Sequence, residues 1–288
     1  MRIKFIVVII AVSLMLGASM LTRGHQWGDD FAWYILQAKS IWNGTTNEFI
    51  KQSAFTNDQS TTYVGPLAYP WGYPLLLVPS YAIKGIHPLA LKLPSLFFYT
   101  GFLACLYLLM KARLSGAESL LLVSLFAFNP LLLQFLDQIL SDIPYLFFST
   151  LSLWLVTKEG KHSTQQNILI GVSIFLVTFL RATGILLLGC FLLVEFFRSI
   201  NYRRDWGAVR QVVLDSLAVC VSFILLWALN SVLFPGGGDS YLSQYSGLNG
   251  ETIRNSVSAY FNVYSLFFGE AAGWRLENGD LRFSANFR

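Results

Sequence analysis

Two adjacent carboxylates, Asp29 and Asp30, stand directly after the first hydrophobic segment of a very apolar chain. Removing a carboxylate from water at a bilayer surface is costly, so the pair calls for an explanation. An aspartate within hydrogen-bond reach of a hydroxyl group can act as a general base. An aspartate can also cap the helix that follows it. A single helix does not need two caps, so capping explains at most one of the two residues and leaves the other for a different role.

Further polar residues interrupt the hydrophobic segments downstream. Asp137, Ser141 and Asp142 lie in one short polar turn, and Arg181 separates two later apolar runs. A guanidinium group suits a phosphate partner because it presents its N–H donors in a fixed fork. Arg181 is a lone cation at the membrane interface, which is the depth at which a lipid phosphate lies.

Each of these residues also has a structural interpretation. Asp142 opens an apolar run and can be an ordinary helix cap, and Asp137 can be a solvated turn residue. Arg181 can be an interfacial anchor whose charged end reaches water. Lys84 and Lys92 are predicted to be anchors at the membrane edge rather than ligands.

The composition is that of an integral membrane protein. Of 288 residues, 55% are hydrophobic and 12% are charged, whereas a soluble domain has roughly 25% charged residues. The net charge of +4 does not indicate a nucleic-acid partner. The three cysteines all lie in hydrophobic runs, which indicates core thiols rather than disulfides or a metal site.

Seven apolar stretches, uncharged except for Glu195 near the end of the sixth, approach the roughly 20 residues that a helix needs to cross a bilayer. With the N-terminus in the cytoplasm, ten of the twenty Lys and Arg residues fall in four short inward-facing segments, as the positive-inside rule requires. This orientation predicts a multi-pass protein of the cell (inner) membrane, surrounded by membrane lipids, with a periplasmic or extracellular active face. The predicted spans are Phe5–Thr22, Leu93–Met110, Ser119–Leu136, Ile143–Thr157, Ser163–Leu180, Ala182–Phe197 and Ser216–Phe234.

Two long segments remain outside, residues 23–92 and 235–288. Apolar residues from Asp30 to Trp42 recur at helical spacing, which predicts an interfacial helix that ends at Asn43-Gly44. Four prolines in Gln59–Ile83 predict a loop along the membrane surface, and Glu251–Phe268 predicts a second interfacial helix. The expected fold is an all-α integral membrane protein, with a transmembrane module over 1–234 and an outer loop over 235–288 that is incomplete at its C-terminal end.

Four short motifs, in the same order, resemble those of the GT-C superfamily of membrane glycosyltransferases. The nearest resemblance is to protein O-mannosyltransferases and bacterial lipid-linked-sugar transferases. The motifs are an acidic pair in the first outer loop, a proline-rich turn, a Ser-acidic-x-Pro helix start and an Arg-x-x-Gly turn. They read here as Gly28-Asp29-Asp30, Tyr69-Pro70-Trp71-Gly72-Tyr73-Pro74, Ser141-Asp142-Ile143-Pro144 and Arg181-Ala182-Thr183-Gly184.

The resemblance implies an enzyme that moves a sugar from a polyprenyl-phosphate-linked donor to a protein, lipid or glycan acceptor, by inverting displacement on the outer face. It implies a base in the acidic pair, favouring the first residue, a second acidic motif, a cation for the donor phosphate, and aromatic residues around the substrate. The base would be Asp29 or Asp30, and Asp142 would be the second acidic motif. Arg181 would bind the donor phosphate, with Lys84 as the second choice. The aromatic residues around the substrate would be Tyr69, Trp71 and Tyr73. The resemblance does not imply a definite cofactor, and it leaves open whether a divalent metal takes part in the reaction.

Two features depart from the family pattern. Some relatives carry a lysine before the loop prolines, where this chain has Ala68-Tyr69-Pro70, so the phosphate partner stays open. Relatives also continue through more membrane helices, so this chain is either a fragment or a truncated gene product, or departs from the family in length.

The alternative functions are a transporter or lipid-handling protein and a non-catalytic fragment. A transporter is expected to have polar residues or broken helices at mid-depth in several spans, and only Pro130 offers that.

Overall fold

The computed structural model describes residues 2–25, 30–61, 65–158, 163–236, 249–266, 274–277 and 280–283. The chain separates into two compact units, Met1–Gly238 and Asp239–Arg288. The predicted base Asp29 lies outside the described residues.

The described part of the first unit is entirely helical. Its elements are α1 (Arg2–Ser19), α2 (Asp30–Asn43), α3 (Thr46–Gln59), α4 (Gly72–Lys84), α5 (Pro88–Met110), α6 (Gly116–Ala127), α7 (Pro130–Leu136), α8 (Asp142–Val156), α9 (Thr164–Leu180), the 3-10 turn η1 (Ala182–Gly184), α10 (Ile185–Asn201) and α11 (Trp206–Leu233).

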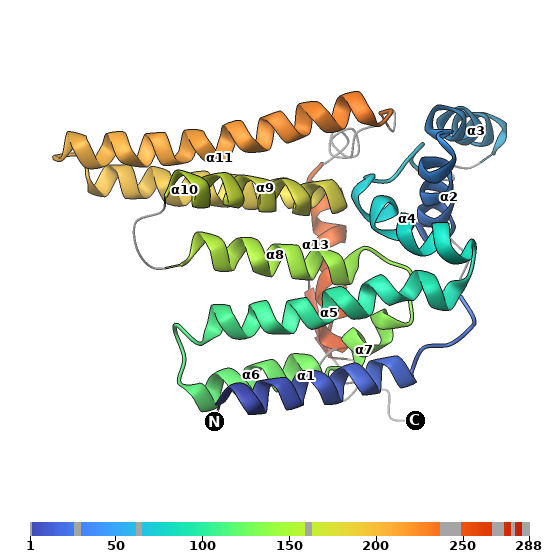
Figure 1. Cartoon of the computed structure of the whole chain (residues 1–288), viewed down its shortest axis with the longest axis horizontal. Coiled ribbons are helices and arrows are strands. Elements are labelled where there is room, and N and C mark those ends of the chain that lie inside the picture. The colour runs from blue at the N-terminus through green and yellow to red at the C-terminus, as the bar shows by residue number, and fades with distance from the viewer. Residues whose placement is uncertain are drawn as a thin grey trace. The chain divides into compact units, whose positions relative to one another are not determined.

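The long helices lie side by side, with contacts that run from α1 to α5, α8, α9 and α11 (Figure 1). Successive turns alternate between two opposite ends of this bundle. One end carries α2, α3 and α4, and we call it the outer end. The other carries the α5–α6 and α10–α11 turns, and we call it the inner end.

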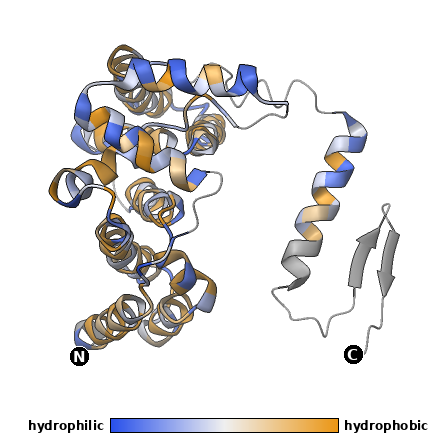
Figure 2. Cartoon of the chain, turned by 90° about the vertical axis from the view of Figure 1, so that its right-hand side faces the viewer, coloured by the Kyte–Doolittle hydropathy of each residue, from blue (hydrophilic) through white to orange (hydrophobic). Residues whose placement is uncertain are grey.

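Among the described residues, three helices are long and apolar enough to cross a membrane, namely Pro88–Met110, Ala182–Asn201 and Trp206–Leu233. A bent pair, α6 with α7, could form a fourth. Three other apolar helices, over Lys4–Ser19, Asp142–Val156 and Thr164–Leu180, are shorter. Figure 2 shows the bundle helices mostly coloured as hydrophobic. By length and composition, up to four helices among the described residues could therefore cross a membrane, and each of the seven predicted stretches is largely helical, although seven crossings stay a prediction.

The predicted span Ser119–Leu136 is not one continuous helix, because the chain bends by 53° between α6 and α7, but the two helices together are long and apolar enough for one broken span. Pro130 is the first residue of α7 and has no N–H to continue the helix before it. The side chain of Asn129 accepts hydrogen bonds from Leu131 N and Leu132 N at 2.9 and 3.1 Å. These bonds start a new helix in a new direction.

The first outer segment contains more helix than the sequence pattern indicates. Helix α2 ends at Asn43, and Gly44 has a φ of 68°, which confirms the predicted stop. Helix α3 was not predicted. The loop predicted over Gln59–Ile83 is wrong from Gly72 onward, where α4 begins. Pro74 lies in its first turn, where a missing N–H costs nothing, and Pro79 is accommodated inside this short helix.

A buried cluster fixes α2 and α4 to the outer end of the bundle. Tyr34 and Tyr73 meet edge to face with ring centroids 4.9 Å apart, and Tyr73 is completely buried. Ile139, just before α8, and Leu180, the last residue of α9, belong to the same cluster, so the start of α8 and the end of α9 pack against α2 and α4. The apolar face of α2 therefore packs on protein at the place where those segments meet.

The second unit contains α13 (Gly250–Leu266) and a two-stranded antiparallel hairpin. This helix confirms that a helix forms where one was predicted over Glu251–Phe268, of which residues 267–268 lie outside the described residues; its position in the membrane interface stays a prediction. In the hairpin, β1 (Trp274–Glu277) pairs with β2 (Asp280–Phe283), with Trp274 opposite Phe283. The sequence pattern did not predict this hairpin.

Candidate functional site

Residues from three distant motifs meet at the outer end of the bundle. Asp30 begins α2, Asp142 begins α8, and Arg181 follows the last residue of α9. The Tyr34 hydroxyl on α2 lies 3.3 Å from the Oγ of Ser141, which immediately precedes Asp142. This contact ties the start of α8 to the helix that carries Asp30.

Asp142 and Arg181 form an ion pair at this junction. Arg181 Nη1 donates to Asp142 Oδ1 over 2.5 Å, and the two side chains are 37% and 28% exposed. The Arg181 guanidinium also lies over the Tyr145 ring, 5.9 Å from its centroid. The interpretation of Asp142 as an ordinary cap is wrong, since Ser141 occupies the cap position and Asp142 faces Arg181. Arg181 is likewise more than a membrane anchor.

The charge environment of Arg181 links all three motif residues. Burial disfavours its charged form, but attraction to the Asp142 carboxylate and the hydrogen bond to it raise the pKa of Arg181 above its ordinary value. Asp30 contributes in the same direction. Arg181 is thus a cation that is stabilised by a carboxylate on α8 and, more weakly, by one on α2.

Two glycines allow the backbone segments around Arg181 to approach closely. A Cβ atom at Gly72 would lie 2.4 Å from the carbonyl oxygen of Phe179, so α4 starts directly against the end of α9. A Cβ at Gly184 would lie 2.5 Å from the backbone nitrogen of Thr178. The glycine of the Arg-x-x-Gly turn is therefore required for η1 to fold back over the last turn of α9.

The proline-rich turn is attached to α2 by a side-chain clamp. Gln37 is completely buried. Its Nε2 donates to Tyr69 O at 2.9 Å, and its Oε1 accepts from Tyr69 N at 3.1 Å. Sequence reasoning missed Gln37, although a polar residue on the apolar face of a predicted helix is a recognisable signal.

The three predicted pocket aromatics have different environments. Tyr69 is half-buried and packs on Tyr34. Trp71 is 6% exposed; it stacks on Phe234, and its Nε1 donates to Pro235 O at 3.0 Å. Tyr73 lies in the core. Tyr69 is thus accessible, whereas Trp71 and Tyr73 act as packing residues that hold α4 in place.

A second ion pair anchors the chain that leads to the acidic pair. Lys92 is completely buried, and its Nζ donates to Asp137 Oδ1, Gly24 O and Thr22 O at 2.7, 2.7 and 2.9 Å. Asp137 also accepts from Thr22 N and Thr22 Oγ1 at 2.6 and 2.7 Å. We call these four residues the Lys92 cluster. The predictions of a membrane-edge Lys92 and a solvated Asp137 are wrong.

Electrostatics at the Lys92 cluster follow from this packing. Burial opposes ionisation of Asp137, but hydrogen bonds from Lys92 and Thr22 lower its pKa below the ordinary value. Burial and the Lys92 charge lower the pKa of His25 to about 4. His25 is therefore neutral near pH 7, and it packs edge to face on Phe31 in the first turn of α2.

Lys84 lies apart from the ion pair. It is exposed and is the last residue of α4, whereas Gly72 at the other end of α4 contacts α9. Twelve residues of helix separate these two positions, about 18 Å at 1.5 Å per residue. Of the two predicted phosphate ligands, Arg181 is the one that pairs with Asp142 and is influenced by the charge of Asp30.

Among the described residues, no group of three or more His, Cys, Asp or Glu side chains is arranged to hold a metal ion. In comparisons with known proteins, no family model, curated protein or solved structure matches this chain.

Proposed function

We propose that this protein is a membrane glycosyltransferase of the GT-C type, acting at the outer end of its helix bundle. One observation carries the proposal. The acidic pair, the proline-rich turn, the Ser-acidic-x-Pro start of α8 and the Arg-x-x-Gly turn are far apart in sequence. Yet Asp30, Tyr69, Ser141–Asp142 and Arg181 are linked through Tyr34, Gln37 and the Asp142–Arg181 pair.

The proposed reaction is a single displacement at the anomeric carbon of a polyprenyl-phosphate-linked sugar. The acceptor hydroxyl loses its proton to Asp29 or Asp30, and its oxygen forms the new bond to the anomeric carbon. The bond to the phosphate oxygen breaks, and the leaving polyprenyl phosphate keeps the electron pair. Attack opposite the leaving group inverts the configuration.

Arg181 supplies charge to the leaving phosphate, and Asp142 orients Arg181. The hydrogen bond from Nη1 to Asp142 and the Tyr145 ring under the guanidinium group restrict the orientation of Arg181. A fixed donor placed where charge develops stabilises the transition state more than a mobile one. Tyr69, the partly exposed aromatic residue of the proline-rich turn that Gln37 holds on α2, would contact the sugar.

We further propose seven membrane passes with a cytoplasmic N-terminus and the site on the outer face. The alternation of turns in Figure 1 supports this topology, as does the concentration of Lys and Arg at the inner end. Single cysteines at Gly116 and Trp206 are expected to resist an impermeant thiol reagent in intact cells, and a cysteine at Gln52 to react. Labelling at Gly116 would invert the topology.

The function is tested by measuring sugar release from polyprenyl-phosphate mannose and polyprenyl-phosphate glucose in membranes that contain the protein. Within the acidic pair, Asp→Asn at the base is expected to lower turnover by about 10²–10⁴-fold. Asp→Asn at a capping residue is expected to change it little, since asparagine caps equally well. Asp58→Asn, an exposed change on α3, is the matched control.

Three results would overturn the proposal: no release by the unchanged protein, full activity in the Asp29→Asn/Asp30→Asn double variant, or equal loss in Asp58→Asn. A parallel reaction with EDTA determines whether a divalent cation takes part. Loss of activity that Mg²⁺ or Mn²⁺ restores would add a metal to the mechanism.

A further inference from the structure

A groove between α2 and α3 at the outer end has a lining that is both aromatic and polar. Its volume is about 340 Å³, at the low end of the range of about 300–1,000 Å³ for small-molecule sites. At the turn between the two helices, Gly44 has a φ of 68°, and Thr45 N donates to Ser40 O at 2.8 Å. This turn folds α3 back against α2, so that the two helices form the walls of the groove (Figure 1).

The aromatic part of the lining consists of Trp33 on α2 and Phe49 on α3. Their rings meet edge to face with centroids 5.4 Å apart. Phe49 is 7% exposed and also contacts the Trp71 ring, with centroids 6.2 Å apart, so the pair packs on the residue that precedes α4. Trp33 is half-buried and lines the groove. Two aromatic rings held in this way give the groove a rigid apolar surface.

The polar part of the lining lies on both walls. It consists of four exposed side chains, Lys39 from α2 and Glu48, Gln52 and Thr56 from α3. An ammonium group only donates hydrogen bonds, a carboxylate only accepts them, and an amide and a hydroxyl group do both. The three α3 residues recur every four positions, so they follow one side of that helix. A ligand in the groove would therefore meet both donors and acceptors.

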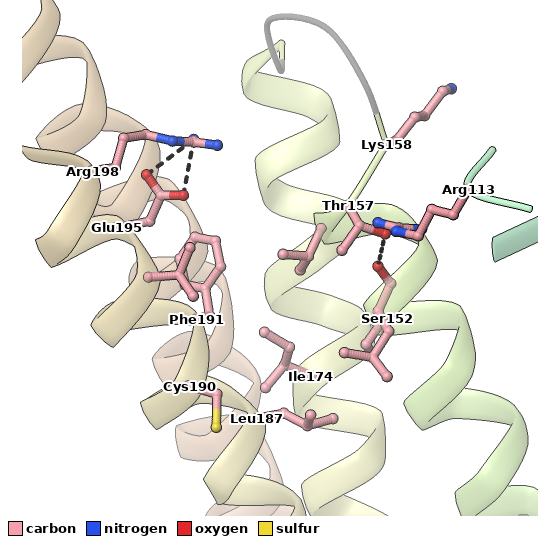
Figure 3. A pocket seen from close by; sticks show the side chains of 13 residues that line it. Arg113, Ser152, Thr157, Lys158, Ile174, Leu187, Cys190, Phe191, Glu195 and Arg198 are labelled. Atoms are coloured by element: carbon pink, nitrogen blue, oxygen red, sulfur yellow. Dashed lines mark hydrogen bonds and ion pairs between the residues drawn. The ribbon is translucent and has the colours of Figure 1, made fainter. Parts of the chain in front are cut away.

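The groove begins one helical turn from the acidic pair. Trp33, Leu36 and Ser40 line it from α2 and recur at helical spacing. Asp30 lies three residues before Trp33 in the same helix, about 4.5 Å along its axis. A larger groove, with a volume of about 460 Å³, lies instead toward the inner end between α8 and α10, with Arg198 in its lining (Figure 3). Of these two grooves, the one between α2 and α3 adjoins the candidate site.

We infer that the groove between α2 and α3 binds a saccharide, as one or two sugar rings of a glycan acceptor. A pyranose ring has C–H groups on its faces, which suit the Trp33–Phe49 surface, and hydroxyl groups around its edge, which both donate and accept hydrogen bonds. A peptide fits less well, because α2 and α3 offer no sheet edge for a strand and the polar wall of α3 disfavours an apolar helix. Saccharide binding does not depend on glycosyl transfer, whereas the role of the saccharide as acceptor rests on the proposed function.

Saturation-transfer NMR of the purified full chain in nanodiscs tests the binding, with mannobiose, cellobiose and N,N′-diacetylchitobiose as probes. We expect at least one of these disaccharides to bind and a serine–alanine tetrapeptide not to bind. Trp33→Leu is expected to weaken binding about tenfold through the lost aromatic surface, and Gln52→Ala about fivefold through one lost hydrogen bond. The matched controls are Trp42→Leu on α2 and Gln59→Ala on α3, both exposed and outside the groove.

Thermal unfolding of each variant separates binding from folding. Gln52 is exposed, so Gln52→Ala is expected to keep the Tm of the unchanged protein even if Trp33→Leu loosens α3. Binding of none of the three disaccharides, equal binding of the tetrapeptide, or equal losses in the control variants would each overturn the inference. Adding polyprenyl-phosphate mannose distinguishes it from the proposed function. Saccharide binding without transfer would support the groove and contradict the glycosyltransferase, whereas transfer with an unchanged KM for the disaccharide in Gln52→Ala would overturn the acceptor role.

Discussion

Replacing Lys92 with methionine tests how the outer end is held together. Methionine fills a similar volume but removes the ammonium group and its three short hydrogen bonds to Asp137, Gly24 and Thr22. The Asp137 carboxylate would then keep only its two bonds from Thr22.

The expected loss of stability follows from burial. Breaking a buried ion pair costs about 3–5 kcal/mol. Lys92 is completely buried, but Asp137 is 26% exposed and can recover some hydration. We therefore expect the lower value, about 3 kcal/mol. At about 2–4 °C per kcal/mol for a unit of this size, Tm falls by roughly 6–12 °C.

The assay is thermal unfolding of the purified protein in nanodiscs, with Lys84→Met as the control. Lys84 is exposed, so the same change there is expected to cost within about 0.5 kcal/mol. Asp137→Leu and the double variant complete a cycle in which the double variant loses less than the sum of the single ones. Equal losses at Lys84 and Lys92, or strict additivity with Asp137, would refute the assignment of a buried pair.

Three further predictions follow. Arg181→Ala is expected to weaken donor binding and turnover, and Arg181→Lys to restore only part, because lysine keeps the charge but not the forked donor geometry; unchanged donor affinity in both variants would remove Arg181 from the phosphate site. Gly184→Ala is expected to destabilise the folded protein by about 1–3 kcal/mol through overpacking. The control Gly189→Ala has open space around it and is expected to stabilise its helix by roughly 0.5–1 kcal/mol. Similar changes in Tm for the two variants would contradict this prediction. The pKa of His25 in the folded chain is about 4, below the ordinary 6.5. Between these pH values the unfolded chain binds more protons, so the free energy of unfolding falls as the pH drops from 6.5 to 4. His25→Gln is expected to flatten that decline, and an unchanged pH profile would show that His25 does not cause it.

Most of the helix positions could be predicted because apolar length and proline placement are local properties. The starts of α8 and α9 lie within one residue of the predicted ones, and α2 ends at the predicted Asn43-Gly44. The sequence indicates Pro130 as a possible break in its span, but the direction and size of the bend depend on the new helix start at Asn129 and on packing.

Side-chain pairing could not be predicted, because it depends on which turns meet in space. Asp137 and Lys92 are 45 residues apart, and neither has a local pattern that distinguishes a buried pair from two surface residues. Asp142 resembled a helix cap for the same reason, since its partner Arg181 is 39 residues away. The candidate site was anticipated through its motifs, whereas the clamp by Gln37 required the structure.

The most direct test of the central claim is to map where a lipid-linked sugar binds. A photoactivatable polyprenyl-phosphate mannose, crosslinked in membranes and located by peptide mass spectrometry, is predicted to label the start of α2, the Tyr69 turn and the Asp142–Arg181 junction. Excess unlabelled donor is expected to compete, and Arg181→Ala to reduce the labelling. Competable labelling confined to the inner end, around Arg113 and Arg198, would contradict the account.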